Sequence, residues 1–258
     1  MDCLRFFSLV NVQAKMNLKA EASRFILSYL WWAIEPLLFV LVFYFVFDVL
    51  LDSGRADFLL FLVCGKIPFM WFQKSVTSAS NSIVQNKGLI NQIDMPKSLF
   101  PYVSVHEALY KQWAVFVVLF CVVMFYGYMP ALHWLWLIPV LIVQYFLILA
   151  CSLLAALCVS FISDFRMLIN MVMLFLLFAS GIFWDINRIV DTQSRSLLLA
   201  CNPIAFLVDA YRQVLMYDAV YDIQHLFILG VVTMTGLLVM HVVMHKMSKT
   251  IAAKVVNS

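Results

Sequence analysis

The stretch NKGLINQIDMPKSLFP, residues 86–101, is a short polar segment between two long apolar segments of a very hydrophobic chain. It carries Lys87, Asp94 and Lys97. One glycine and two prolines keep it from joining the apolar helices expected on either side, because proline cannot continue a helix and glycine weakens one. The pattern therefore predicts a separate short helix at residues 86–101.

The composition outside this stretch is that of a membrane protein. Hydrophobic residues make up 65% of the chain, charged residues only 12%, and the mean hydropathy is +0.97. Soluble domains carry about 25% charged residues. A membrane-spanning helix needs about 20 apolar residues, so 258 residues can supply roughly six. We expect an all-α integral membrane protein, one transmembrane domain over residues 1–258, with six spans.

Apolar runs place the spans, and Pro68 lies inside the second of them. A proline in a helix interior removes a backbone hydrogen bond, so we expect this span to be broken. Residues 1–27 alternate apolar and basic side chains at helical spacing, which predicts an amphipathic interface helix on the membrane surface. The six predicted spans are residues 28–47, 58–84, 103–126, 134–162, 167–184 and 225–243.

The connection at residues 185–222 is long but not plainly polar. Asn202 can cap a helix whose first residue is Pro203. Apolar residues then recur on one face of this helix, while Asp209 and Arg212 lie elsewhere on it. The pattern predicts a pair of short re-entrant helices that dip into the outer leaflet before the sixth span.

Lysine and arginine are divided unequally between the connections. Twelve of them lie in the N-terminal segment, the 74–111 region, the 163–166 turn and the C-terminal tail, against four in the 48–57 and 185–222 connections. Cytoplasmic loops carry the excess of basic residues, so both termini and the 86–101 helix are predicted to be cytoplasmic. No internal repeat is visible, so a symmetric pathway would need a second copy of the chain.

No phosphate-binding loop occurs in the sequence. The Gly65-Lys66 pair is followed by Ile67 and lacks the required upstream glycine. The six cysteines form no CxxC pair, and we expect neither a metal site nor catalytic residues. Energy for any work done by this chain is therefore expected from a nucleotide bound elsewhere.

Two ionisable residues lie at the predicted depth of the lipid core, where such groups usually face a cavity or one another. Glu35 either faces a cavity or sits near the inner interface. Lys66 can extend to the outer interface, but its place beside Pro68 favours a water-filled pathway. Glu107 and Lys111 are one helical turn apart and are predicted to form a structural ion pair.

An aromatic stripe runs along the first span, where Phe39, Phe43 and Phe47 recur every four residues with Tyr44 alongside. Packing or lipid contact is the ordinary role of such a stripe. The alternative is a substrate pathway on which sugar rings slide, because aromatic faces stack on the apolar faces of sugars.

Taken together, several stretches of the chain resemble one transporter family. The combination is similar to the membrane subunits of type-two ABC exporters that carry capsular polysaccharide or O-antigen across the bacterial inner membrane. The stretches are SYLWWAIEPLL (28–38), FLVCGKIPFMWFQKSVTSASNSIVQNKGLI (61–90), IDMPKSLFP (93–101) and NPIAFLVDAYRQVLM (202–216).

The resemblance implies a homodimer driven by two separate ABC ATPase subunits, with residues 86–101 as the cytoplasmic coupling helix and residues 185–222 as a re-entrant gate segment. In the stretch after Leu89-Ile90 the family often has a basic residue and an aromatic, where this chain has Asn91, Gln92 and Met95. Asn91 and Gln92 are the first positions to examine for partner specificity. The residues expected to couple to the ATPase are Leu89, Ile90, Asn91, Gln92, Ile93, Met95 and Pro96.

The function implied by the resemblance is that of a channel-forming transport subunit, not an enzyme. Its cargo would be a lipid-linked capsular polysaccharide. We expect this polymer to be acidic, because Lys66 places a cation where the family commonly has an apolar residue. ATP and Mg²⁺ would bind to the partner ATPase, and this chain is expected to bind no cofactor. Periplasmic envelope export proteins are further expected partners, and nucleic acid is not.

Other functions are less well supported by the sequence. Type-two ABC export of a drug or a smaller glycolipid is the nearest alternative. A membrane-embedded glycolipid transferase would need clustered His, Asp or Glu at one membrane face, and the cytoplasmic side offers no such cluster. A structural scaffold would not explain a broken span, a buried charge and a re-entrant segment together.

Overall fold

The computed structural model describes residues 3–23, 28–50, 57–93 and 95–257. These residues form helices joined by turns, with no β-strand among them, which confirms the all-α prediction. The helices are α1 (Cys3–Ala22), α2 (Ser28–Tyr44), the π-helix η1 (Phe45–Leu50), α3 (Phe58–Gln85), α4 (Lys87–Gln92), α5 (Leu99–Phe125), the 3-10 helix η2 (Leu132–Trp136), α6 (Leu137–Phe161), α7 (Phe165–Ala179), the 3-10 helix η3 (Ile186–Arg188), α8 (Thr192–Cys201), α9 (Pro203–Met216), α10 (Ile223–Lys246) and α11 (Ser248–Asn257).

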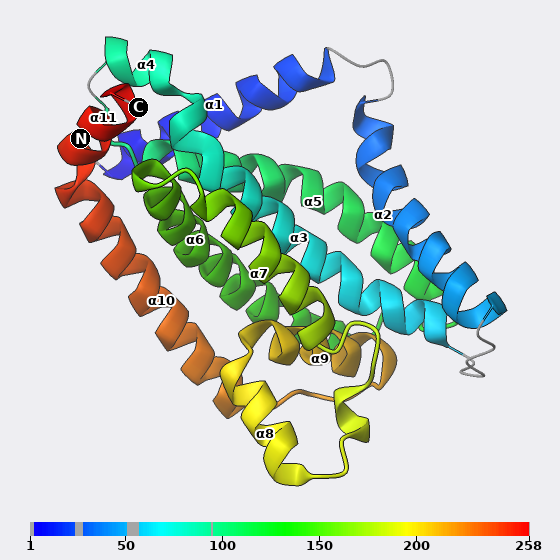
Figure 1. The fold of residues 1–258 in the computed structure, drawn as a ribbon. Helices are drawn as coiled ribbons and strands as arrows, with labels where there is room; N and C mark the ends of the chain where they lie inside the picture. Colours follow the sequence, from blue (N-terminus) through cyan, green and yellow to red (C-terminus); the bar gives the residue numbers. More distant parts are fainter. Residues whose placement is uncertain (1–2, 24–27, 51–56, 94, 258) are drawn as a thin grey trace.

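Helix α3 is the centre of the bundle (Figure 1). It packs against α5, α6, α7 and α9, while α10 lies along α6 and α2 stands at one edge against α3 and α5. Because neighbours surround it, α3 is buried along most of its length. The break expected at Pro68 does not occur, since α3 runs as one helix from Phe58 to Gln85. Packing on several sides holds the helix together across the proline.

Four helical segments are long and apolar enough to cross a membrane among the described residues, namely α3, α5, η2 with α6, and α10. The chain is thus a multi-pass membrane protein. Helix α7 has only 15 residues, and α2 has 17 before it continues into the six residues of η1. The predicted count of six spans stays a prediction.

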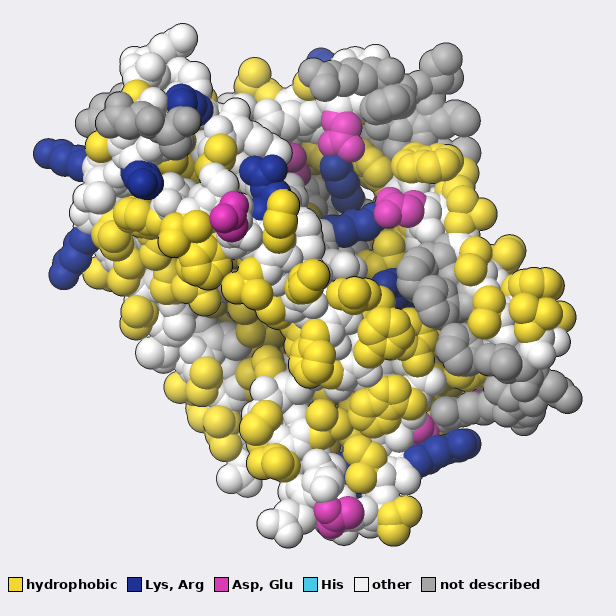
Figure 2. Space-filling model, in the orientation of Figure 1, with side chains coloured by type: hydrophobic (Ala, Val, Ile, Leu, Met, Phe, Trp, Pro, Cys, Tyr) yellow, Lys and Arg dark blue, Asp and Glu magenta, His cyan; other side chains and the backbone are white. Residues whose placement is uncertain are grey.

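The two ends of the bundle differ in what they carry. Helices α1, α4 and α11 and both chain termini lie at one end, and η3, α8 and α9 lie at the other (Figure 1). Figure 2 shows many of the lysine and arginine side chains of the visible face near the first end, next to a broad apolar belt. We call these the α4 end and the α9 end.

The polar stretch at residues 86–101 is not one helix. Helix α4 ends at Gln92, and α5 begins at Leu99, four residues before the span predicted at 103–126. Proline disfavours helical conformation in the residue before it, so Pro96 separates the two helices. Pro101 is tolerated in the first turn of α5, where a backbone N–H needs no partner within the helix. Asp94 lies outside the described residues.

Candidate functional site

The predicted coupling residues lie at the tip of the α4 end. Ile90 is buried and anchors α4, whereas Asn91, Gln92 and Ile93 are exposed. Ile93 shows 49% of its surface, so this face of α4 carries an apolar side chain beside two amides. Of the other predicted coupling residues, Leu89, Met95 and Pro96 are half-buried.

Helix α4 depends on its neighbours for stability. It has six residues, and isolated helices shorter than about 12–15 residues are marginal in water. The C-terminal helix α11 packs against both α4 and α6, with Ile251 and Val255 buried. Packing against α11 therefore holds α4 in place while one face of α4 stays exposed.

The predicted gate helix α9 begins as the sequence indicates. The Asn202 side-chain oxygen accepts hydrogen bonds from the backbone N–H groups of Ile204 at 3.1 Å and Ala205 at 3.2 Å, with Pro203 in the first turn. The Asn202 amide also donates to the Ser180 hydroxyl at 3.0 Å. This single side chain both caps α9 and ties it to the end of α7.

Arg212 attaches α9 to the rest of the bundle. Its side chain is 1% exposed and donates to three backbone carbonyls, from Nη1 to Gly181 at 2.7 Å, from Nη2 to Ile182 at 2.9 Å, and from Nε to Phe61 at 3.2 Å. Nη2 also reaches the Phe61 carbonyl, at 3.1 Å, and the guanidinium lies 3.4 Å from the centre of the Phe61 ring.

Two glycines allow these contacts of Arg212 in different ways. A Cβ atom on Gly65 would lie 2.5 Å from Arg212 Nη2, closer than any real contact. Gly181 has a φ of +69°, in the left-handed region that favours glycine, and so ends α7 with its carbonyl available to Arg212. Neither role was predictable from the sequence, because both depend on Arg212, which lies far away in the chain.

Asp209, the other charged residue predicted for the gate, does not bond to Arg212. Its carboxylate accepts from Asn187 Nδ2 at 3.1 Å and from Gln213 Nε2 at 2.5 Å. Asn187 in turn accepts a hydrogen bond from Arg195. This chain of contacts links η3, α8 and α9.

Helix α8 is capped by Asp191, whose carboxylate accepts from the Ser194 hydroxyl and from the backbone N–H groups of Gln193 and Ser194. These hydrogen bonds hold the pKa of Asp191 below its ordinary value.

A second buried chain of hydrogen bonds joins α9 to the central helix. The Tyr211 hydroxyl donates to Gln144 Oε1 at 2.7 Å, and Gln144 Nε2 donates to the Pro68 carbonyl at 2.9 Å. All three residues are buried. Sequence reasoning did not identify Tyr211 or Gln144 as partners; a polar amide inside an apolar span was the available signal.

Of the predicted substrate-pathway residues, the structure describes the side chains of Lys66 and Tyr44. Lys66 is only 4% exposed, and its Nζ lies 5.3 Å from the centre of the Phe69 ring. Tyr44 is half-buried at the end of α2. Whether Lys66 and Tyr44 face a pathway stays a prediction. The side chains of Phe39, Phe43 and Phe47 lie outside the described part of the structure.

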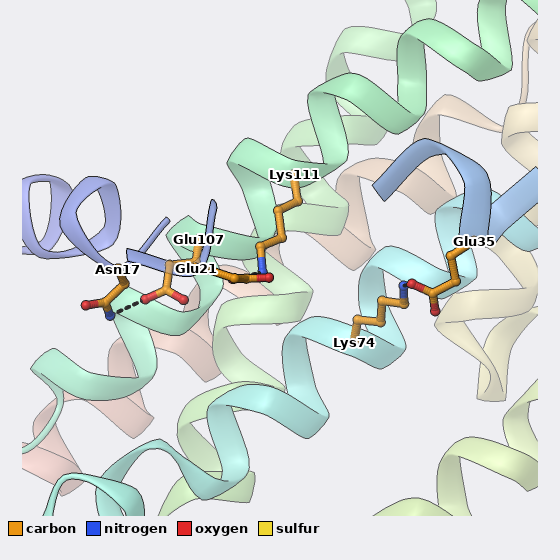
Figure 3. A network of polar contacts seen from close by, with 6 residues as sticks. All are labelled: Asn17, Glu21, Glu35, Lys74, Glu107 and Lys111. Atoms are coloured by element: carbon orange, nitrogen blue, oxygen red, sulfur yellow. Dashed lines mark hydrogen bonds and ion pairs between the residues drawn. The ribbon is translucent and has the colours of Figure 1, made fainter. Parts of the chain in front are cut away.

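The structure corrects the ion pair predicted within α5 (Figure 3). Lys111 Nζ lies 2.6 Å from Glu21 Oε2, and Glu107 accepts a hydrogen bond from Asn17, so both pair with α1. Because α1 lies against α5 and presents Asn17 and Glu21 one turn apart, it competes successfully for both side chains.

Glu35 pairs across helices as well. Its Oε2 lies 2.6 Å from Lys74 Nζ, which joins α2 to α3, and both side chains are about half-exposed (Figure 3). Exposed ion pairs contribute about 0–1 kcal/mol, so these contacts specify how the helices align more than they stabilise them.

Within the described ranges, no three His, Cys, Asp or Glu side chains come close enough to hold a metal ion. The structure thus shows an exposed surface at Asn91–Ile93 at the α4 end and the buried helix α9 at the other end. Helix α9 packs against α3, and α4 follows α3 in the chain.

Comparison with known proteins agrees with the expected family. The family model described as "ABC-2 type transporter" matches residues 13–216, from within α1 to the last residue of α9. Two O-antigen export system permease proteins RfbA of Klebsiella pneumoniae are 26% and 27% identical to this chain, over 90% of this chain and of each relative. One of Myxococcus xanthus is 27% identical over 84% of both chains. These findings confirm the resemblance drawn from the sequence.

Proposed function

We propose that this chain, which belongs to the ABC-2 type transporter family, is the membrane subunit of an ATP-driven polysaccharide exporter. The observation that carries the proposal is the exposed face of α4, with Asn91, Gln92 and Ile93 at the basic end of an apolar bundle. A soluble partner can reach this face without entering the membrane. The relatives, named for O-antigen export, indicate the class of cargo.

The partner is an ABC ATPase, two copies of which act on a homodimer of this chain. ATP and Mg²⁺ bind those subunits, and no nucleotide or other cofactor binds here. The α4 end lies in the cytoplasm with both termini, and the protein resides in the bacterial inner membrane.

Force applied to α4 reaches the gate through α3. Helix α4 follows α3 directly, with Asn86 as the residue between them. Near its other end, α3 offers the Phe61 carbonyl to Arg212 of α9. A displacement of α4 therefore moves the helix to which the gate is fastened.

The cargo is a lipid-linked, acidic polysaccharide, either capsular or O-antigen. Lys66 supplies a cation on α3, between the gate contact at Phe61 and Pro68. The aromatic residues Phe39, Phe43, Tyr44 and Phe47 provide a surface for sugar rings. Periplasmic envelope proteins continue the path beyond the membrane.

The coupling step is tested by replacing residues 89–96 with glycine and serine and purifying the chain with the ATPase encoded beside it. We expect export and substrate-stimulated ATP hydrolysis to be lost. Glycine and serine replacement of exposed Gln193 and Ser196 at the α9 end is the matched control. If export and stimulated hydrolysis survive the change at 89–96, the coupling role is wrong.

The cargo is tested separately in a strain that lacks this chain. We expect lipid-linked polysaccharide to accumulate inside the cell and the chain supplied in trans to restore surface polysaccharide. Normal surface polysaccharide in the deletion strain would exclude this cargo while leaving the coupling result untouched.

A further inference from the structure

One face of α3 carries polar side chains along the half of the helix nearest α4. They are Lys74, Thr77, Ser78, Asn81 and Gln85, and we call them the polar stripe. Residues three and four apart lie on the same face of a helix, so these five line up over about 16 Å. Lys74, Ser78 and Gln85 are exposed, and Thr77 and Asn81 are half-buried. The stripe is therefore a polar surface on a helix that is mostly buried.

The neighbouring helix α6 shows what faces outward at the same level. Gln144 of α6 donates to the Pro68 carbonyl of α3 at 2.9 Å, and both helices run from the α9 end toward the α4 end (Figure 1). The same offset of 76 residues brings Leu154 about level with Ser78. Leu154 is 50% exposed, and Ile162, just after the last residue of α6, is 53% exposed. The outward surface of α6 is thus apolar at the level of the polar stripe.

Helices α7 and α10 are also apolar on the outside in this half of the bundle. Met167 and Met171 of α7 are 74% and 72% exposed, and Leu238 and Val242 of α10 are 60% and 50% exposed. All four lie in the half of their helix nearest the α4 end. Such surfaces suit lipid tails, whereas hydroxyl and amide side chains find no hydrogen-bond partners among lipid tails. The polar stripe therefore differs in kind from the lipid-facing surfaces beside it.

A charged pair at the end of the stripe farthest from α4 also calls for water. Lys74 Nζ lies 2.6 Å from Glu35 Oε2 of α2, and the two side chains are 48% and 46% exposed (Figure 3). Charged groups at membrane depth are costly in lipid and usually face a water-filled cavity. Because Glu35 neutralises Lys74, the stripe favours an uncharged partner rich in hydrogen-bonding groups over a phosphate.

We propose that the polar stripe lines a water-filled passage that opens at the α4 end, and that its side chains hydrogen-bond to the hydroxyl groups of a sugar chain. Hydroxyl and amide groups exchange hydrogen bonds with water for hydrogen bonds with sugar at little net cost, so the chain can move along the stripe without one strong binding step. Lys66, predicted for the pathway from the sequence, follows on α3 toward the α9 end. The sugar rests on the proposed function, whereas the water-filled passage does not.

The passage is tested by labelling single added cysteines in the full exporter, this chain with its ATPase. Inside-out membrane vesicles expose the α4 end to a maleimide that cannot cross membranes. The variants are Ser78→Cys in the stripe, Leu154→Cys at the same level on α6, and Thr250→Cys on the exposed surface of α11. Labelling of the unmodified chain, which carries the exposed Cys121 and Cys201, is subtracted.

The expected difference follows from the chemistry of thiols. A thiol reacts as its thiolate, and apolar surroundings that raise its pKa by one unit slow labelling about tenfold. We expect Ser78→Cys to label about tenfold faster than Leu154→Cys, at a rate near that of Thr250→Cys. If Ser78→Cys labels no faster than Leu154→Cys, the passage is overturned, because lipid or a second copy of the chain then covers the stripe.

The sugar is tested by repeating the labelling in vesicles from two strains, one that makes the polysaccharide and one that does not. The exporter is supplied with ATP and then stopped with orthovanadate, which leaves cargo in place. We expect Ser78→Cys to lose labelling in the fraction of exporters that retain polymer, and Thr250→Cys to lose none. Equal labelling of Ser78→Cys in both strains overturns the contact with sugar. Normal surface polysaccharide in the deletion strain would instead exclude the proposed cargo, while the difference between Ser78→Cys and Leu154→Cys would remain.

Discussion

Replacing Arg212 with methionine removes the contacts that fasten the gate helix, and the cost can be worked from the structure. The carbonyls of Gly181 and Ile182 are in the turn after α7 and lose the donors at 2.7 and 2.9 Å. The Phe61 carbonyl lies within α3 and can keep its helical partner. A hydrogen bond to a charged group contributes about 1.5–3 kcal/mol, so two of them give about 3–6 kcal/mol.

The assay is the stability of the purified protein in detergent, followed by heating or by titration with a denaturing detergent. A loss of this size lowers the midpoint of thermal unfolding by about 6 °C or more. Arg212→Lys is expected to recover only part of it, because an ammonium group cannot reproduce the planar fork that reaches all three carbonyls.

The matched control is Arg188→Met, because Arg188 is an exposed arginine of the same outer segment. Substitutions at such positions usually change stability by about 0.5 kcal/mol or less. The reasoning is refuted if Arg212→Met costs no more than Arg188→Met. That result would mean that the turn carbonyls find water or other donors once the guanidinium is gone.

Three further substitutions test neighbouring contacts. Gly65→Ala places a methyl group 2.5 Å from Arg212 Nη2, so we expect a loss of about 1–3 kcal/mol in the same stability assay, and no change would show that the guanidinium can move aside. Tyr211→Phe leaves the buried oxygen of Gln144 without its donor and should cost about 1–3 kcal/mol, whereas an unchanged midpoint would argue that this hydrogen bond is replaced. Lys66→Glu should impair export of an acidic polymer more than Lys66→Gln does, measured as surface polysaccharide; equal effects would indicate packing instead of charge.

Features set by local chemistry were predictable from the sequence. The apolar runs predicted helices, and the cap at Asn202 with Pro203 depends on residues two and three positions away, so a single sequence contains all of it. The short helix α4 was expected because Gly88 and Pro96 interrupt the apolar pattern. The structure ends α4 at Gln92, well before the end of the helix predicted at residues 86–101.

Features set by distant packing were not predictable. The pairing of Lys111 with Glu21 depends on α1 lying along α5, and no spacing within α5 reveals that neighbour. The continuity of α3 through Pro68 depends on the helices around it. Arg212 was recognised as a gate residue by resemblance, but its acceptors are 30 to 151 residues away in the chain.

The contacts of Arg212 have a consequence for how this protein can change over generations. Every hydrogen bond from the guanidinium ends on a backbone oxygen, which is present whatever residue occupies that position. Position 182 can therefore accept other apolar residues without loss of the hydrogen bond from Arg212 to its carbonyl. Gly65 and Gly181 cannot change so freely, because one leaves space and the other adopts a φ of +69°. Divergence should accordingly erase most of the local sequence while leaving the arginine and two glycines in place.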